Sequence, residues 1–379
     1  MIKNIHNSDY ERYIHFLSVG SWSYSNVNNA TLKDADQSLR TQKKISGKPT
    51  GLILDETSHL KKDNKSVGVK QQYAGVSGKV DNYQVSVHTS LSNDSFCALV
   101  DTSLFLPQEW AQNSQRCKAA GIPTTNQKYQ TKPELALALV KNAIAQGVDF
   151  GFVGGGLYGH NAELARALDQ LPGILYVLDA HKDELVFLEE PSFSIPPEKG
   201  SKGRTPMVRQ PNITPILLQE YVSSLSDNNF TVEKVLKIAE EWKQMQVHTV
   251  TIWHWDGKEE KAQKRTLITT RGEKLKFSFS NETRETYSNK EWAYFQCSRY
   301  WVERCFDDCK NELGMSGYQV TGWLTWQRHM TLVMMASLYM LRMKIKARGQ
   351  LPILSVRDAR LLMIATLFGT RVFNWMYPY

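Results

Sequence analysis

The chain has 379 residues, a formal net charge of +8 at pH 7, and 41% hydrophobic and 11% aromatic residues. These side chains are enough to build one large core or two fused ones, which excludes a disordered chain. The most apolar stretch, residues 330–343, is too short to span a bilayer, and the N-terminus lacks a signal-peptide core. We therefore expect a soluble, cytoplasmic protein, and the net charge favours a polyanionic partner.

The positive charge is concentrated near the C-terminus. Residues 320–379 contain one acid, Asp358, and eight cations: Arg328, Arg342, Lys344, Lys346, Arg348, Arg357, Arg360 and Arg371. This stretch is a candidate for sequence-independent contact with nucleic-acid phosphates. A solvated face on a pair of core helices is the alternative interpretation.

The five cysteines, at positions 97, 117, 297, 305 and 309, show no paired metal-binding spacing. Buried, reduced thiols in an intracellular protein explain them better than a zinc site does.

The first 180 residues alternate between strand and helix patterns. Residues 1–47 are polar and favour helices near 10–17 and 30–43. Leu52-Ile53-Leu54 predicts a buried strand that ends on an acid, Asp55. The elements expected after it are a lysine-bearing loop at 61–65, strands within 67–106, a helix at 132–146, a strand at 149–153, a helix at 161–171 and a strand at 174–178. This order predicts an α/β core.

The pattern changes after residue 180. Prolines punctuate residues 191–215, and the segments expected next are a helix near 232–246, strands at 247–255 and 265–279, one helix at 289–313, and helices at about 323–346 and 355–369. The predicted organisation is a helical N-terminal segment at 1–47, the first part of the core at 48–180, a β-rich insertion at 181–287, and the helix of Glu303 with basic C-terminal helices at 288–379.

Two acids stand out as candidates for chemistry. Asp55 follows a buried strand, where open α/β sheets place ligand-binding residues, although a turn or cap residue is the simpler interpretation. Glu303 shares one helix face with two cations, because at about 100° per residue Arg299 and Lys310 project within about 40° of it. The stripe is either a solvated salt bridge or a carboxylate in a cleft with cations that hold phosphates.

The Arg-x3-Glu-x6-Lys spacing of Arg299, Glu303 and Lys310 resembles the signature helix of bacterial insertion-sequence DDE transposases. The segments that look like this family are 52–87, 104–123, 152–169 and 300–323, so the resemblance extends over roughly residues 10–370. It implies an α/β fold with a ribonuclease-H-like mixed sheet flanked by helices and a β-rich insertion between the second Asp and the Glu.

The resemblance also implies a reaction and its partners. Asp55 and Glu303 would be catalytic and metal-binding carboxylates for Mg²⁺ or Mn²⁺, with two ions in an intact site. Arg299 and Lys310 would contact DNA phosphates. The partners would be element terminal inverted repeats and target DNA, and the chain would act as a homodimer in a synaptic complex, associated with the nucleoid.

The chain departs from the family pattern at the second acid. The family has an Asp three residues before a Tyr-Gly turn, where this chain has Gly155 before Tyr158-Gly159; a one-residue deletion would give the same result. Asp149 lies roughly 20 Å upstream along the strand, too far to substitute. Asp179, after the next strand, is the candidate replacement for the missing acid. The alternative interpretation is that Asp179 is an ordinary loop residue.

Two smaller departures accompany this one. Gln296 stands where the family has a Tyr seven residues before the Glu, and the segment before Asp55 is shorter than in the family, as if truncated. Two hypotheses follow: an active transposase with a non-standard third ligand, or a catalytically impaired DNA-binding relative, decayed or regulatory. A metal-dependent nuclease unrelated to transposition has little support beyond the acids.

Overall fold

The computed structural model describes residues 7–74, 78–156, 158–159, 161–196, 207–238, 241–347 and 355–361. The chain divides into two units, a first unit of residues 1–150 with 300–379 and a second unit of residues 151–299. The predicted boundary at residue 180 falls inside the second unit, and the division into four segments stays a prediction.

The first unit is built on an antiparallel sheet. Its strands are β1 (Gly51–Leu60), β2 (Lys70–Ala74), β3 (Lys79–Asn93) and β4 (Phe96–Leu104). The long strand β3 lies at the centre and pairs with β1, β2 and β4. Leu52, Ile53 and Leu54 of β1 are fully buried. The apolar run before Asp55 therefore forms the core that the sequence predicted.

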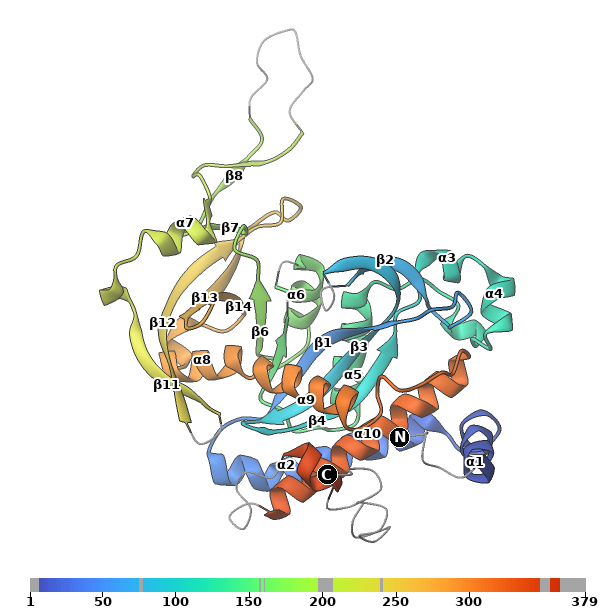
Figure 1. The fold of residues 1–379 in the computed structure, drawn as a ribbon. Coiled ribbons are helices and arrows are strands. Elements are labelled where there is room, and N and C mark those ends of the chain that lie inside the picture. The colour runs from blue at the N-terminus through green and yellow to red at the C-terminus, as the bar shows by residue number, and fades with distance from the viewer. Residues whose placement is uncertain are drawn as a thin grey trace. The chain divides into compact units, whose positions relative to one another are not determined.

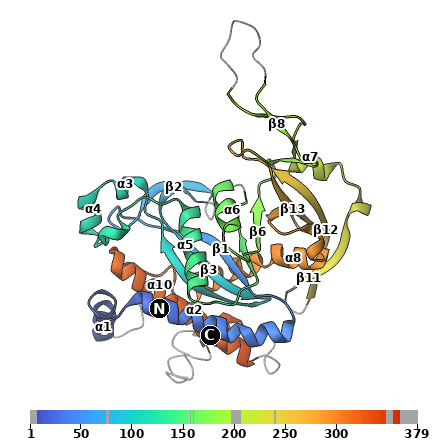
Figure 2. The ribbon, with the colours of Figure 1, turned by 180° about the vertical axis from the view of Figure 1, so that it is seen from behind.

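Helices cover both faces of this sheet. The helix α5 (Lys132–Ala145) packs on the face seen in Figure 2, where Asn142 donates a hydrogen bond of 2.7 Å to Asp101 of β4. The helix α9 (Arg299–Asn311) lies on the face seen in Figure 1, where Phe306 contacts the His88 ring edge-on. The other helices of this unit are α1 (Asn7–Ser18), α2 (Tyr24–Ser46), α3 (Gln108–Ala111), α4 (Ser114–Ala119) and α10 (Trp323–Ala347).

Local sequence explains the start of α5. Thr131 and Glu134 form a reciprocal capping box, and Pro133 occupies the first turn, where its missing N–H costs nothing.

The second unit contains a larger sheet with strand order β10-β7-β12-β13-β14-β6-β5, and β11 pairs with β12. Its strands are β5 (Phe152–Gly155), β6 (Tyr176–Ala180), β7 (Leu185–Phe187), β10 (Ile216–Leu217), β11 (Thr231–Ile238), β12 (Glu241–His254), β13 (Gln263–Arg271) and β14 (Leu275–Ser280). A two-stranded arm of β8 (Phe193–Ser194) and β9 (Gln210–Pro211) leaves this sheet (Figure 1). The pair β5–β6 is parallel, with helix α6 (Ala162–Asp169) between its strands in the chain; the unit's other helices are α7 (Leu218–Ser223) and α8 (Asn289–Cys297).

In chain order, the four antiparallel strands β1 to β4 are followed by helices α3 to α5, strand β5, helix α6 and strand β6, the order expected of a ribonuclease-H-like core. The mixed strand directions and the flanking helices confirm the predicted α/β fold class. Among the described helices, none combines the length and apolarity required to cross a membrane.

The helix predicted near 232–246 is wrong, because these residues form the hairpin of β11 and β12. Val235 and Leu236 are both buried since the pairing register shifts between Lys234 and Leu236. Such an irregularity breaks the two-residue alternation of a strand, so the apolar spacing imitates a helix.

The single helix predicted at 289–313 is two helices, α8 and α9, which meet at Ser298. The Ser298 hydroxyl donates a hydrogen bond of 2.7 Å to the Tyr294 carbonyl. A serine that bonds back to the preceding turn competes with the helical hydrogen bond and favours a bend. The helix predicted after residue 355 is seen only over 356–361, and its remainder lies outside the described residues.

Candidate active site

Asp55 lies within β1 rather than at its end, because the pairing with β3 continues to Leu60. The predicted strand end at Asp55 is therefore wrong. Asp55 is half-buried and stands opposite His88 of β3. Side chains opposite each other on paired strands share a face, so Asp55 faces the side of the sheet that α9 covers.

The helix α9 brings Lys310 to Asp55. Burial lowers the pKa of the Lys310 ammonium, and the charges of Asp307 and Asp55 oppose this effect. Lys310 is half-buried, whereas Glu303, two turns earlier on the same helix, is exposed. The structure therefore places Asp55 and Lys310 within electrostatic reach of each other, and Glu303 lies at an exposed position of the same helix.

Two buried histidines that the sequence did not point to lie beside this group. His59 lies on the same face of β1 as Asp55, and His88 of β3 lies opposite Asp55. The exposed fraction of His59 is 6% and that of His88 is 1%. Burial, then the nearby charge of Lys310, lowers the pKa of His59 to about 3. Burial, then the neighbouring His59, holds the pKa of His88 well below its ordinary value. The alternation of Asp55, Thr57 and His59 on β1 is the signal that could have identified His59 from sequence.

These neutral histidines make the first unit sensitive to acid. Some histidines have a lower pKa in the folded protein than in the unfolded chain, where it is about 6.5. Such a histidine contributes its full stability to the fold above about pH 6.5, and this stability is lost as the pH falls toward the folded pKa. For His59, with a folded pKa of about 3, we expect the loss to reach roughly 3 kcal/mol by pH 4. His59→Phe, which cannot titrate, should flatten the dependence of the unfolding free energy on pH between 7 and 4, measured by urea denaturation.

The control for this measurement is His181→Phe, because His181 is exposed, with 56% of its side chain accessible. Equal pH slopes in the parent chain and His59→Phe would contradict the assignment of a buried, neutral His59.

The end of β5 carries glycines where the family pattern has an acid. Gly155 is buried and lies opposite Leu178 in the parallel pairing with β6. Asp179 follows Leu178 and is also buried, with 9% of its surface exposed. Its carboxylate accepts hydrogen bonds from Arg299 at 3.0 Å and from the Ser278 hydroxyl at 2.7 Å.

Arg299 occupies the space beside these glycines. A Cβ atom placed on Gly156 would lie 2.6 Å from the guanidinium carbon of Arg299, so that guanidinium rests directly on the glycine backbone. Burial raises the pKa of Asp179, and the Arg299 charge is the largest effect that opposes the rise. In this unit Asp179 is therefore the partner of an arginine.

Gln296, which replaces the family's tyrosine, is a buried structural residue. Its side-chain amide donates to the Ser278 hydroxyl at 2.8 Å and to the Ile268 carbonyl at 3.2 Å, and it accepts from Thr270 at 2.5 Å. These bonds satisfy the amide within the second unit and fix α8 on its sheet.

The described residues do not fit a two-ion carboxylate site. Within the part of the chain that the structure describes, no three His, Cys, Asp or Glu side chains gather closely enough to hold a metal ion. Hard divalent ions need several oxygen ligands. The glycines at the end of β5 supply none, and Asp179 is held by Arg299. All five cysteines are free thiols, and only Cys97 is not fully buried.

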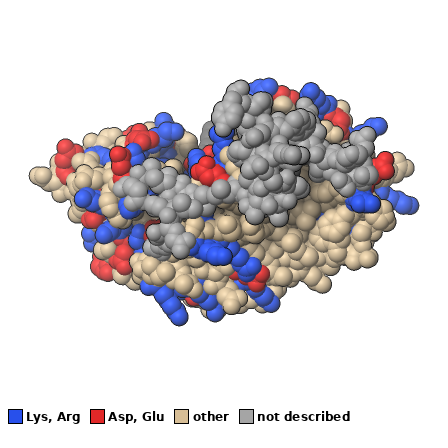
Figure 3. Space-filling model, turned by 60° about the horizontal axis from the view of Figure 1, so that its bottom comes forward, with Lys and Arg blue, Asp and Glu red and all other residues tan. Residues whose placement is uncertain are grey.

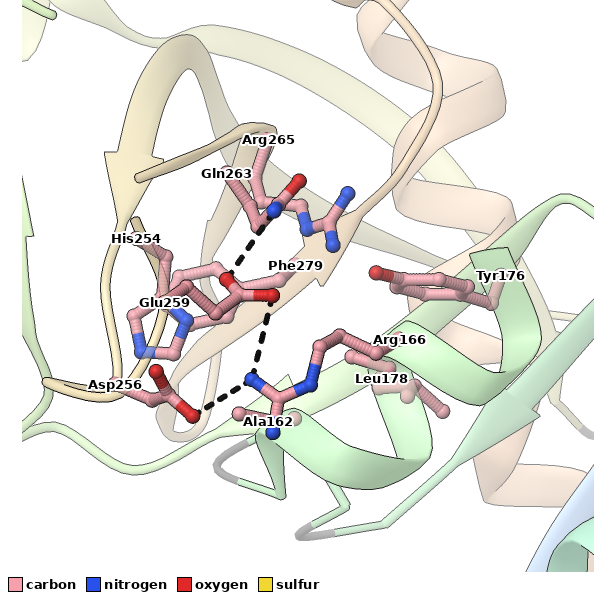
Figure 4. Close-up of a pocket in the computed structure, with 12 residues that line it drawn as sticks. Ala162, Arg166, Tyr176, Leu178, His254, Asp256, Glu259, Gln263, Arg265 and Phe279 are labelled. Carbon is pink, nitrogen blue, oxygen red and sulfur yellow. Dashed lines mark hydrogen bonds and ion pairs between the residues drawn. The ribbon is translucent and has the colours of Figure 1, made fainter. Parts of the chain in front are cut away.

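A separate polar pocket lies in the second unit, between α6, the sheet and the loop at 255–262 (Figure 4). Arg166 of α6 points between two acids of that loop, Asp256 at 2.7 Å and Glu259 at 3.4 Å. Arg265 of β13 pairs with Asp169 at 2.5 Å. Because both arginines are engaged by acids, these ion pairs tie α6 to the β12–β13 hairpin.

Comparisons with known proteins match this chain to a protein family and to a curated relative. The profile of a family described as DDE superfamily endonuclease matches residues 1–249. The chain is 33% identical over 159 residues to a probable transposase for insertion sequence element IS701 from Microchaete diplosiphon. This aligned region covers 41% of this chain and 37% of that protein. The chain thus spans little more than a third of the length of that curated relative.

Among solved structures, the NurA nuclease from Sulfolobus solfataricus aligns over 99% of this chain and 100% of its own, with 10% identity and a TM-score of 0.26.

Proposed function

The chain belongs to the DDE superfamily endonucleases, and we propose that it is an insertion-sequence transposase that binds DNA but is impaired in cutting it. The observation that carries the proposal is the glycine end of β5, where the guanidinium of Arg299 lies against Gly156 and holds Asp179.

Endonucleases of this superfamily use divalent metal ions, which activate the attacking oxygen and stabilise the leaving oxygen of the phosphodiester. In this chain we assign Asp55 and Glu303 as the remaining catalytic carboxylates and candidate ligands of Mg²⁺ or Mn²⁺. With glycine at position 155, the family's second acidic ligand is missing from this set. Loss of groups that merely orient metal ligands costs about 10–100-fold in affinity or activity, and loss of a ligand itself costs at least as much.

We further propose that the DNA substrates are the terminal inverted repeats of an element and its target, and that two copies act together in a synaptic complex. Lys310 is the better candidate for a phosphate contact, because Arg299 is engaged by Asp179. Lys310 lies beside Asp55, and the negative charge of a neighbouring phosphate would oppose the lowering of its pKa by burial.

Binding and cutting should separate in the purified protein. We expect fluorescence anisotropy to show binding to duplex DNA that weakens steeply with salt. We expect supercoiled plasmid in Mg²⁺ or Mn²⁺ to be nicked no faster by the parent chain than by Glu303→Gln.

The parent–Glu303→Gln comparison also identifies contaminants, since a nicking activity that survives Glu303→Gln does not come from this site. Rapid nicking by the parent that Glu303→Gln abolishes would overturn the impairment and favour an active transposase with another third ligand. Failure to bind DNA at low salt would overturn the function itself.

A further inference from the structure

We propose that a cationic surface on the first unit, formed by the loop at 61–65 and helix α4, binds the phosphate backbone of duplex DNA. This loop–α4 surface consists of Lys62, Lys65, Arg116 and Lys118. The inference rests on the proposed function, since it names where a DNA-binding chain makes its sequence-independent contact.

The loop is held in one conformation by its own polar groups. The Asp63 carboxylate accepts from the backbone N–H groups of Lys65 and Ser66, both at 2.7 Å. The Asn82 amide of β3 donates to the carbonyls of Lys61 at 3.0 Å and Asp63 at 2.7 Å. With the backbone satisfied internally, the Lys62 and Lys65 side chains are left exposed to solvent.

Helix α4 is attached to the same loop through Arg116. The Arg116 guanidinium stacks 3.7 Å above the Trp110 ring and donates to the Asn64 carbonyl at 2.8 Å. Trp110 is 1% exposed, and its indole N–H donates to the Val69 carbonyl at 2.8 Å. Loop and helix therefore form one rigid support, which reduces the entropy lost when a ligand binds.

The charges of this surface are not neutralised by the protein. Within the described part of the chain, Lys62, Lys65, Arg116 and Lys118 form no ion pair with an acid. The loop also contains one carboxylate, Asp63, which accepts from the loop's own backbone, and Glu109 pairs with Lys70 at 2.7 Å; the four cations outnumber the single anion of the loop.

Of the C-terminal cations that the sequence favoured for this role, Arg348 and Arg371 lie outside the described residues, and four of the other six are engaged. Arg342 pairs with Asp34 at 2.9 Å, Lys344 lies 3.8 Å from Asp308, and Arg360 pairs with Glu312 at 2.7 Å. Arg328 is 6% exposed and donates to the backbone carbonyls of Leu17, Gly20 and Trp22. On the face that carries α2 and α10, positive and negative side chains are interspersed (Figure 3).

Duplex DNA fits a rigid, unpaired cationic surface. Its backbone carries one charge per roughly 1.7 Å of helix axis, and lysines that neutralise phosphates release condensed counterions whatever the base sequence. Lysine side chains contact phosphates as point charges without base specificity, so the surface positions DNA without selecting it.

The test compares two triple variants with the same change in net charge. Lys62→Ala/Lys65→Ala/Lys118→Ala removes the lysines of the loop–α4 surface. Lys33→Ala/Lys44→Ala/Lys141→Ala removes three exposed lysines of α2 and α5. Binding of a random 30-base-pair duplex is measured by anisotropy across a series of salt concentrations, and circular dichroism confirms that both variants are folded.

We expect the surface variant to bind at least about tenfold more weakly at low salt, and the slope of log K against log salt to decrease by about 2 to 3. The control variant should change both quantities little. If both variants behave alike, the surface assignment is wrong while DNA binding by the parent still stands; if the parent binds no DNA, the proposed function fails first.

Discussion

Gly155→Asp is expected to raise metal-dependent nicking of plasmid DNA by at least about 100-fold over the parent chain. The family pattern places its second acid at this position, at the end of β5 beside Leu178. In the family pattern, an acid here belongs to the same catalytic set as Asp55 and Glu303. The gain should disappear in Gly155→Asp/Glu303→Gln, and calorimetry with Mn²⁺ should detect ion binding in Gly155→Asp that the parent lacks.

The neighbouring variant Gly156→Asp is the matched control. Gly156 directly follows the last residue of β5, and a Cβ at this position would meet the Arg299 guanidinium. The carboxylate of Gly156→Asp would be captured by Arg299 and should restore neither nicking nor ion binding. Recovery by Gly156→Asp alone would show that the family acid corresponds to position 156; recovery by neither folded variant would show that more than one ligand is missing.

Arg299→Gln is expected to destabilise the second unit by about 3–5 kcal/mol at pH 7, because it leaves the buried Asp179 carboxylate without its cation. The Arg299 and Asp179 side chains are 24% and 13% exposed, and the pair is 3.0 Å apart. Urea denaturation monitored by tryptophan fluorescence measures the change. The control is Arg304→Gln, since Arg304 on the same helix is 57% exposed and 4.0 Å from Asp308, a pair worth at most about 1 kcal/mol.

The loss should depend on pH in a defined direction. Burial already raises the pKa of Asp179, and removing Arg299 removes the largest opposing effect. A carboxylate with a raised folded pKa contributes stability below its unfolded pKa and loses it as the pH rises through the folded pKa. Arg299→Gln should therefore be more destabilised at pH 7 than at pH 5.

The double variant Asp179→Asn/Arg299→Gln should recover most of the stability at pH 7, because two neutral amides leave no buried charge. DNA affinity distinguishes the two roles considered for Arg299. We expect Arg299→Gln to bind DNA like the parent at temperatures where both are folded. A folded, stable Arg299→Gln with weakened binding would instead make Arg299 a phosphate contact.

Local patterns were sufficient for much of the fold. The apolar run before Asp55 predicts a buried strand, and residues 132–146 predict a helix that the structure has over Lys132–Ala145. These signals succeed because burial of a strand and capping of a helix depend on residues close in sequence. The helix predicted near 232–246 was wrong, because the shift in pairing register near Lys234 disturbs the strand's apolar alternation. That shift depends on the partner strand β12, which local sequence does not reveal.

The sequence by itself determined the family, the absence of an acid at position 155 and the shared helix face of Arg299, Glu303 and Lys310. The tertiary structure decided how the charges are used. It paired Arg299 with Asp179 and brought Lys310 and two neutral histidines to Asp55. It also paired Arg342, Lys344 and Arg360 with acids, whereas the described cations of the loop–α4 surface form no ion pair with an acid. The physical reason is that a charge takes its role from the groups within a few ångströms of it, and those groups come from distant parts of the chain.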